Sequence, residues 1–245
     1  MDKPKFQTIL CDTEESRTLH YRIRYQVYCR QTGFDNPKEF TDGKEIDGHD
    51  RHSVHFVVRD PLNSQWMAAM RLVLAGSGRI PLEEFCNVEP LPEKLLDRSN
   101  FVEFSRLCVL QSHRRHNRDR SIEFRVVDGG AGGVRITRPD PRYPEIMLGL
   151  INSTFEWARR NDVRYCYFLI NRALARTLQR LNLDLKPVGN PIEHRGTRTP
   201  YIVDMRDSEL RMKQKLSFFR ELARQDVHYY HYSQLQNELS DTAMA

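Results

Sequence analysis

Apolar and polar positions alternate along the chain in two periods, which predicts a mixed order of strands and helices. Short apolar runs bounded by turn residues indicate strands at residues 6–10, 54–58, 66–74, 102–110, 163–170 and 200–205. Apolar residues at helical spacing indicate helices at residues 13–31, 145–160, 171–181 and 207–223. The tail after Tyr232 shows neither period, so we expect weak order there and no strand after residue 205. No repeat or linker interrupts this order, which favours one α/β domain spanning residues 1–245.

The helix predicted at residues 13–31 has two different faces. Thr13 is the expected N-cap, Gly33 the expected end, and Leu19, Ile23 and Val27 form a core stripe. A second face at similar spacing carries cations, tyrosines and an amide: Arg17, Tyr21, Arg24, Tyr28 and Gln31. An arginine beside tyrosines is suited to grip a carboxylate, because its planar fork binds two oxygens at once. A plain solvated face would have the same composition.

Three carboxylates follow this helix in a polar, turn-rich stretch. Glu45, Asp47 and Asp50 would either hold an ammonium group, orient Arg24, or simply be solvated. Three histidines lie nearby: His49, His52 and His55. Because their spacing matches no common zinc site, we predict no metal centre.

Glu103 and Arg106 lie three positions apart in a predicted strand. Along a regular strand such residues point to opposite faces, so one of the two charges would face the core. A β-bulge near Phe104 or Ser105 would bring both to the same side. It would also expose a backbone N–H able to bind an oxyanion that develops during a reaction. The alternative is an edge strand on which both charges are solvated.

Composition narrows the class of protein. The 245 residues are 39% hydrophobic and 29% charged, with a mean hydropathy of -0.65. No apolar run reaches about 18 residues, and the N-terminus lacks the apolar segment of a signal peptide. Five cysteines are widely scattered: Cys11, Cys29, Cys86, Cys108 and Cys166. These features predict a cytoplasmic protein with reduced thiols.

The net charge of +5 leaves a polyanionic partner open. A basic stretch at residues 113–125 would suit nucleic acid, which makes a nucleic-acid-binding module the second class of function. However, no recognised DNA- or RNA-binding motif is present, and Asp119 and Glu123 interrupt the basic stretch. We therefore expect no nucleic-acid partner.

Several segments resemble one acyltransferase family. They are Arg24-Tyr25-Gln26-Val27-Tyr28 with Gly33-Phe34, Glu45-Ile46-Asp47-Gly48-His49-Asp50, His52-Ser53-Val54-His55-Phe56, Met70-Arg71-Leu72-Val73 and Glu103-Phe104-Ser105-Arg106-Leu107. Over roughly residues 6–115 the chain is similar to GNAT-fold enzymes that include autoinducer synthases and N-acyl amino acid synthases. The most similar are bacterial acyltransferases associated with PEP-CTERM/exosortase systems. The resemblance implies a GNAT-like mixed central sheet flanked by helices. It also implies transfer of a fatty acyl chain from a thioester to the amine of an amino acid or related small molecule.

The resemblance also implies which residues do the work. The implied catalytic residues are Glu103, to orient or deprotonate the amine, and Arg106. The implied substrate-binding positions are Arg24, Tyr28, Phe34, Asp47, Asp50 and Arg71. Arg24 and Arg71 have two open roles, to bind the acceptor carboxylate or to hold the acidic cluster. Autoinducer synthases usually have Phe in place of Tyr28 and Trp in place of Phe34, which favours an amino acid over S-adenosylmethionine as acceptor.

The segment after the strand that ends at Leu110 bears on the acyl donor. It lacks the glycines that cradle the pyrophosphate of coenzyme A in most GNAT enzymes. Its arginines suit an acidic acyl carrier protein instead, and we expect four of them to dock it: Arg114, Arg115, Arg118 and Arg120. An acyl-phosphopantetheine thioester would then be the donor, carried by the carrier protein or by coenzyme A, with no permanently bound cofactor.

Residues 111–143 form an insertion relative to autoinducer synthases. Within it, residues 118–143 carry a glycine-rich centre flanked by apolar residues, which suggests a flap that orders when donor binds, or a plain surface hairpin. Two further alternatives stay open for the whole chain. One is an acyl-homoserine-lactone-type autoinducer synthase, and the other is an acyl-sensing relative without activity.

Overall fold

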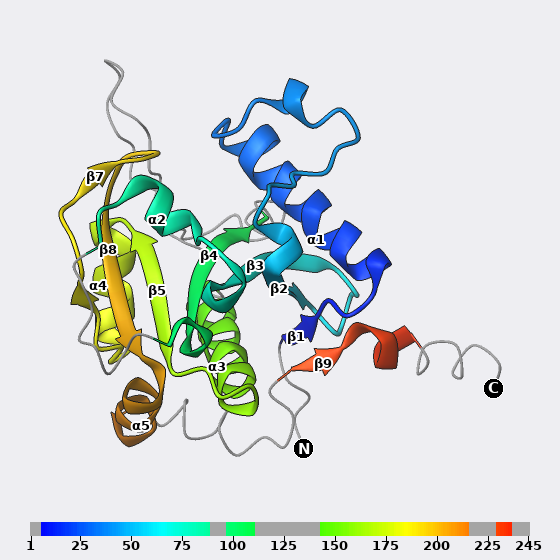
Figure 1. The fold of residues 1–245 in the computed structure, drawn as a ribbon. Coiled ribbons are helices and arrows are strands. Elements are labelled where there is room, and N and C mark those ends of the chain that lie inside the picture. Colours follow the sequence, from blue (N-terminus) through cyan, green and yellow to red (C-terminus); the bar gives the residue numbers. More distant parts are fainter. Residues whose placement is uncertain (1–5, 89–96, 111–142, 216–228, 237–245) are drawn as a thin grey trace, which may run out of the picture.

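A twisted sheet runs through the whole molecule (Figure 1). The computed structural model describes residues 6–88, 97–110, 143–215 and 229–236. The strands of the described residues are β1 (Gln7–Leu10), β2 (Ser53–Arg59), β3 (Trp66–Leu74), β4 (Phe101–Val109), β5 (Tyr165–Ile170), β6 (Lys186–Pro187), β7 (Ile192–Glu193), β8 (Thr197–Asp204) and β9 (Tyr230–His231). Their order is β6-β8-β5-β4-β3-β2-β1-β9, with β7 paired to β8. The sheet is mixed, as expected, because β4 and β5 are parallel whereas β1 to β4 are antiparallel neighbours.

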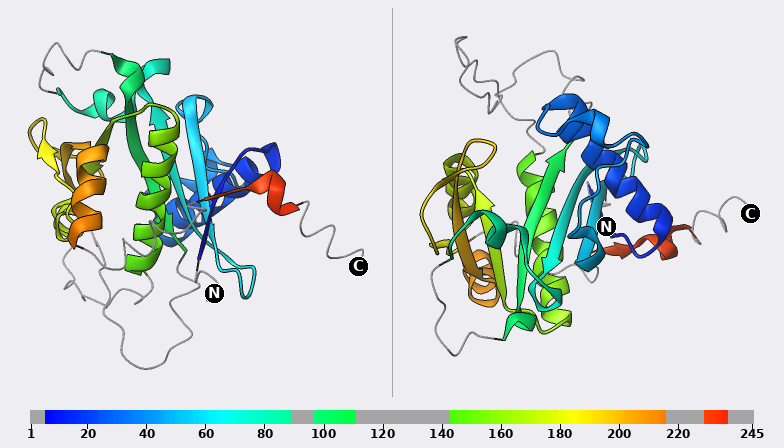
Figure 2. Two further views of the ribbon diagram at one scale, coloured as in Figure 1. Left: turned by 90° about the horizontal axis from the view of Figure 1, so that it is seen from below. Right: turned by 45° about the horizontal axis from the view of Figure 1, so that its top comes forward.

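Helices cover both faces of this sheet (Figures 1 and 2). The α-helices are α1 (Glu14–Tyr25), α2 (Pro81–Phe85), α3 (Tyr143–Arg160), α4 (Arg172–Arg180) and α5 (Met205–Lys215). Helix α1 begins at the predicted Thr13 cap, which forms a capping box with Ser16, and continues as a π-helix over Gln26–Gln31. Among the described residues, no helix is both long and apolar enough to cross a membrane.

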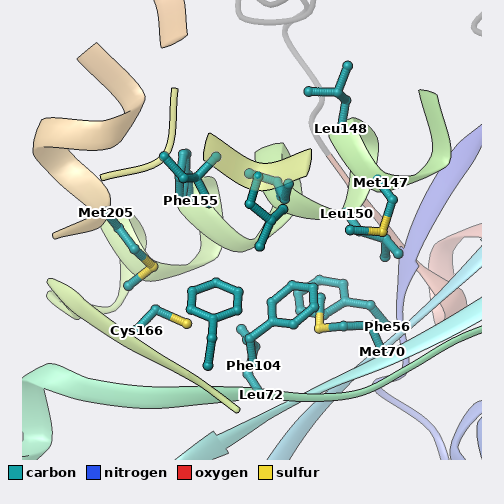
Figure 3. Packing of buried hydrophobic residues seen from close by; sticks show 14 of the residues in the cluster. Phe56, Met70, Leu72, Phe104, Met147, Leu148, Leu150, Phe155, Cys166 and Met205 are labelled. Carbon is teal, nitrogen blue, oxygen red and sulfur yellow. The ribbon is translucent and has the colours of Figure 1, made fainter. Parts of the chain in front are cut away.

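The main core lies between the sheet and the helices α3, α4 and α5. Alternate residues of the central strands, such as Met70, Leu72 and Phe104, pack against Met147 and Leu150 of α3 (Figure 3). The strands are apolar on this face at every second position, which is the pattern that predicted them. This core holds the sheet in place and leaves the opposite face available for other chemistry.

The opposite face carries two smaller apolar clusters with charge between them. Under α1, Ile23 and Val27 pack on Ala69. Under α2, Leu82 packs on Val73. Because side chains alternate along β3, Arg71 lies on the same face as Ala69 and Val73, between the two clusters. The candidate site is built around this arginine.

Strands β4 and β5 pair over only part of their length. Their parallel register runs from Phe101 opposite Tyr165 to Phe104 opposite Phe168. Both strands continue, β4 to Val109 and β5 to Ile170, without pairing to each other. The centre of the sheet therefore opens beyond Phe104, next to Glu103 and Arg106.

The structure corrects the sequence analysis at several boundaries. Strand β9 follows residue 205 and pairs in parallel with β1, and residues 232–236 are helical, so the expectation of no later strand was wrong. Helix α5 begins at Met205 rather than at residue 207. The analysis missed α2, β6 and β7, because two to five residues are too few for a period to show.

Candidate functional site

Six charged side chains form a closed ring on the α1 face of the sheet, in which each cation contacts at least two carboxylates. We call it the ionic ring. In order around it, the members are Arg24, Glu45, Arg106, Asp47, Arg71 and Asp50.

One half of the ionic ring is deeply buried. Arg24 pairs through Nε with Glu45 and through Nη1 with Asp50 Oδ1, at 2.5 Å. The same Asp50 oxygen lies 2.8 Å from Arg71 Nη1 and 3.1 Å from His55 Nε2. Burial alone would raise the pKa of Asp50, but the hydrogen bond with His55 and the two guanidinium charges hold it far below its ordinary range. Asp50 is therefore a fixed negative charge.

The other half of the ionic ring reaches toward solvent. Arg106 Nη2 lies 2.7 Å from Asp47 Oδ2, and Arg106 Nε lies 3.2 Å from Glu45 Oε1. Asp47 also accepts from Arg71 Nη1 at 2.6 Å. The side chains of Arg106 and Asp47 are 19% and 24% exposed, whereas those of Arg24 and Arg71 are 0% exposed. Any ligand that meets the ionic ring therefore meets Arg106 and Asp47 first.

This geometry favours one of the two roles left open for Arg24 and Arg71, that of holding the acidic cluster. Both side chains are fully buried and their charges are committed to the carboxylates of the ionic ring. Direct contact of either with an acceptor carboxylate does not fit this arrangement.

A bulge in β4 lies where the ionic ring meets the strand. Arg71 is opposite Ser105 and Ala69 is opposite Cys108, so Arg106 and Leu107 together face one residue of β3. Arg106 adopts a positive φ of 53°. The bulge therefore comes directly after Ser105, near the position that the sequence analysis expected. The result is the expected one, since Glu103 and Arg106 lie on the same face.

Glu103 is a buried carboxylate directly beside this bulge. Its side chain faces α2, where Oε2 accepts the backbone N–H of Leu82 at 2.7 Å. Burial is the dominant influence and raises the pKa of Glu103 to about 8, against the opposing effects of this hydrogen bond, Arg71 and Arg106. A carboxylate with such a pKa exchanges its proton near neutral pH, which is what a general base requires.

Tyr28 forms the wall of the site on the α1 side. Its hydroxyl donates to the carbonyl oxygen of Leu107 at 3.0 Å, and its ring lies beneath two guanidinium groups. The Cζ atoms of Arg106 and Arg195 are each 5.7 Å from the ring centroid. Phe34 is 37% exposed and lies 5.9 Å from the same Arg195. Arg195 thus lies close to both predicted site residues, Tyr28 and Phe34, and Arg106 lies close to Tyr28.

Arg195 and its neighbours in the β7–β8 hairpin are the part that the sequence analysis missed. His194, Arg195 and Arg198 come within reach of the site although they lie about 90 residues after Glu103 in the chain. The available signal was two arginines flanking Gly196, a glycine typical of a hairpin tip. Nothing in the pattern linked that tip to the earlier motifs.

Some expectations fall on other parts of the chain. Arg114, Arg115, Arg118, Arg120 and the expected flap at residues 118–143 lie outside the described residues, apart from the start of α3. Within the described ranges, no group of three or more His, Cys, Asp or Glu side chains is placed to hold a metal ion. The five cysteines are all buried and free.

Comparison with known proteins identifies the fold. Residues 23–122 match the family described as an acetyltransferase (GNAT) domain. The comparison with curated proteins found no match. Together with the mixed sheet flanked by helices, the family match identifies a GNAT acyltransferase domain in this chain.

Solved structures of acyl-transferring synthases share this fold. The CoA-dependent acyl-homoserine lactone synthase BjaI, solved with MTA, has a TM-score of 0.61 at 14% identity, covering 92% of this chain and 93% of its own. TofI, solved with an inhibitor and MTA, has a TM-score of 0.55 at 18% identity, covering 81% and 91%. FeeM, an N-acyl amino acid synthase from uncultured soil microbes, has a TM-score of 0.51 at 11% identity, covering 85% and 96%.

Proposed function

We propose that this protein is an N-acyltransferase that moves a fatty acyl chain from a thioester to the amine of an amino acid or related small molecule. The observation that carries the proposal is the position and the pKa of Glu103. This buried carboxylate lies beside a bulge, at the opening between β4 and β5, and its pKa is raised to about 8. The fold shared with acyl-homoserine lactone synthases and with FeeM supports the same class of reaction.

The proposed reaction removes two protons from the acceptor nitrogen. Glu103 takes the first from the ammonium form, directly or through one water, and the neutral nitrogen attacks the thioester carbonyl carbon. The C–N bond forms and the carbonyl oxygen becomes an oxyanion; as the C–S bond breaks, the nitrogen loses its second proton and the departing sulfur takes it up, which leaves an amide and a free thiol. A free α-amine has a pKa of about 7.7–8.0, so a base of this strength is matched to it.

The bulge and the ionic ring supply position. The backbone N–H groups at Arg106 and Leu107 lie where the ladder to β3 is irregular, and we assign them to the developing oxyanion. The ionic ring fixes Arg106, and Tyr28 fixes Leu107, so the bulge is held from both sides. Holding reactants and donors in place is expected to contribute most of the acceleration.

The proposed donor is an acyl-phosphopantetheine thioester. The chain segment after β4 lacks the usual glycines for coenzyme A, so we favour an acyl carrier protein, docked by Arg114, Arg115, Arg118 and Arg120. The link to exosortase systems belongs to this proposal as well and rests on the sequence motifs alone.

The test uses the purified full chain with acyl carrier protein and coenzyme A thioesters of several chain lengths, each offered with a panel of amino acids and with S-adenosylmethionine. Mass spectrometry detects N-acyl products and released thiol. We expect N-acyl amino acids, and Glu103→Gln should reduce kcat/KM about 10²–10⁴-fold. Glu209→Gln on α5, where Glu209 pairs with Lys213, is the matched control and should keep normal rates.

Three outcomes count against the proposal in different ways. Full activity of Glu103→Gln would remove the base role. Acyl-homoserine lactone from S-adenosylmethionine as main product would establish the autoinducer-synthase alternative. Absence of acyl transfer with every donor and acceptor would leave an acyl-sensing role, which binding of the thioester without turnover would reveal.

A further inference from the structure

The tip of the β7–β8 hairpin is fixed across the candidate site. Strand β7 pairs with β8 through Ile192 opposite Arg198 and Glu193 opposite Thr197. At the tip, Arg195 forms an ion pair with Asp35 near the end of the π-helix. The ring of His194 lies against Phe85 of α2, with centroids 4.0 Å apart. The hairpin thus joins the two elements that flank the face carrying Glu103.

Three arginines gather beneath this tip, and two of them have acidic partners. Arg106 belongs to the ionic ring, and Arg195 pairs with Asp35. Arg198 is different. Its one hydrogen bond among the described residues is a long one, 3.4 Å from Nη1 to the carbonyl oxygen of Leu169, and its Nε is buried without a partner.

The electrostatic surroundings of Arg198 are positive. Burial lowers the pKa of Arg198 most, and the charges of Arg195 and Arg106 lower it further; Tyr28 acts in the opposite direction, but no carboxylate of the described residues does. The same three arginines, after burial, lower the pKa of His194. A half-buried guanidinium held against two others is costly unless an anion joins it. The arrangement is one that a bound anion would complete.

The place of Arg198 relates it to the reacting centre. It contacts Leu169 of β5, two residues beyond Tyr167, which is the partner of Glu103 in the parallel ladder. The guanidinium of Arg198, which projects from β8, therefore reaches the part of β5 that lies just beyond its pairing with β4. A small molecule at this opening has Arg198 on the β5 side and Glu103 on the β4 side, so its anionic and amine ends can be directed to different strands.

We propose that Arg198, assisted by Arg195, binds the carboxylate of the acyl acceptor. The acceptor is then a free amino acid, whose carboxylate is gripped under the hairpin while its amine faces Glu103. This inference rests on the proposed function and adds the acceptor class and two residues that select it. A phosphate of the thioester donor has the same charge chemistry, so the experiment separates the two anions.

The experiment compares wild type with Arg198→Gln and with Arg176→Gln, an exposed arginine of α4 that serves as the matched control. Each enzyme is assayed with an amino acid, with its carboxamide, and with the amine that lacks the carboxyl group. Loss of a charge-assisted contact should raise KM for the amino acid about 10–100-fold in Arg198→Gln and leave KM for the thioester unchanged. The amide and amine should be poor substrates of wild type and be unaffected by the substitution.

A second arm examines the donor. If the anion were the phosphate of the phosphopantetheine arm, Arg198→Gln would raise KM for that donor, and an acyl thioester of pantetheine without phosphate would respond equally in both enzymes. That result, or wild-type enzyme that acylates amino acid and amine equally well, overturns the inference while the proposed function stands. No transfer to any acceptor by wild type would instead refute the proposed function.

A binding measurement keeps the test decisive if turnover is slow. Thermal denaturation of each folded protein is followed with increasing amino acid, and then with inorganic phosphate alone. We expect stabilisation of wild type and of Arg176→Gln by the amino acid, and none of Arg198→Gln. Equal stabilisation of all three proteins by the amino acid would overturn the inference.

Discussion

The hydroxyl of Tyr28 donates a hydrogen bond to the carbonyl oxygen of Leu107, so that the π-helical end of α1 supports the bulge in β4. The two residues are 79 positions apart in the chain. Because the ring is buried, burial raises the pKa of Tyr28 and keeps the phenol protonated as a donor. The bulge is therefore shaped by a contact outside the sheet.

Tyr28→Phe should remove the hydrogen bond to Leu107 and keep the aromatic ring in the site. We expect a loss of roughly 1 kcal/mol in the free energy of unfolding, from one hydrogen bond, and a several-fold drop in kcat. Chemical denaturation and steady-state kinetics measure the two effects. Tyr25→Phe, at the half-buried C-terminal end of α1, is the control, and an equal effect of both substitutions would contradict the proposed support.

The rate of acyl transfer should rise with pH through the pKa of Glu103. Glu103 acts as a base only when ionised, and burial places its pKa at about 8. We therefore expect kcat/KM to increase up to about pH 8 and to level off above it. The acceptor amine titrates in the same pH range as Glu103. With an acceptor whose amine has a lower pKa, the rise of kcat/KM that is due to Glu103 should stay at the same pH. A rise that moves entirely with the acceptor would contradict this assignment.

Glu103 should also make the protein less stable at alkaline pH. The pKa is raised from 4.5 to about 8 on folding, so this group favours the folded state below pH 4.5, and that contribution is lost as pH rises through about 8. Glutamine cannot ionise and resembles the protonated acid. Above pH 8 the free energy of unfolding of Glu103→Gln should thus exceed that of wild type by roughly 2–4 kcal/mol, and at pH 4 the two should be equal. Denaturation at the two pH values measures it, and a pH-independent difference would be inconsistent with a raised pKa.

Neutralising Asp50 should damage the fold more than the chemistry. Asp50→Asn keeps the shape but leaves Arg24 and Arg71 short of a negative charge in a buried setting, which costs roughly 3–5 kcal/mol. Asp42→Asn is the control, since Asp42 is exposed and pairs only with Lys44 among the described residues. Similar free energies of unfolding for the two variants would show that the ionic ring is not a stabilising unit.

The sequence carried the fold and the identity of the charged residues, but not the way they pair. Periodicity predicted β2 to β5 and α1 closely, because long apolar patterns dominate those elements. Residues Arg24, Asp50 and Arg106 were singled out, yet their joining in a ring depends on the register of β3 and β4 around the bulge. Register and bulges follow from packing between distant segments, which a one-dimensional pattern does not contain.

The hairpin shows the same limit more strongly. Arg195 and Asp35 are 160 positions apart. Arg198 can be recognised as part of the site only when Arg106, from β4, is known to lie near it. From the sequence alone, the short basic stretch around Gly196 is indistinguishable from an ordinary turn. The part of the site that would choose the acceptor was therefore invisible in the sequence.

A closed ring of alternating charges has no end member. Each of the three cations and three carboxylates has at least two partners in it, so a change at any position leaves at least two neighbours short. Tolerated changes at these six positions should come as concerted exchanges of a cation and a carboxylate, not singly. Among related sequences, the six positions should accordingly vary together or not at all, while the exposed residues around them drift independently.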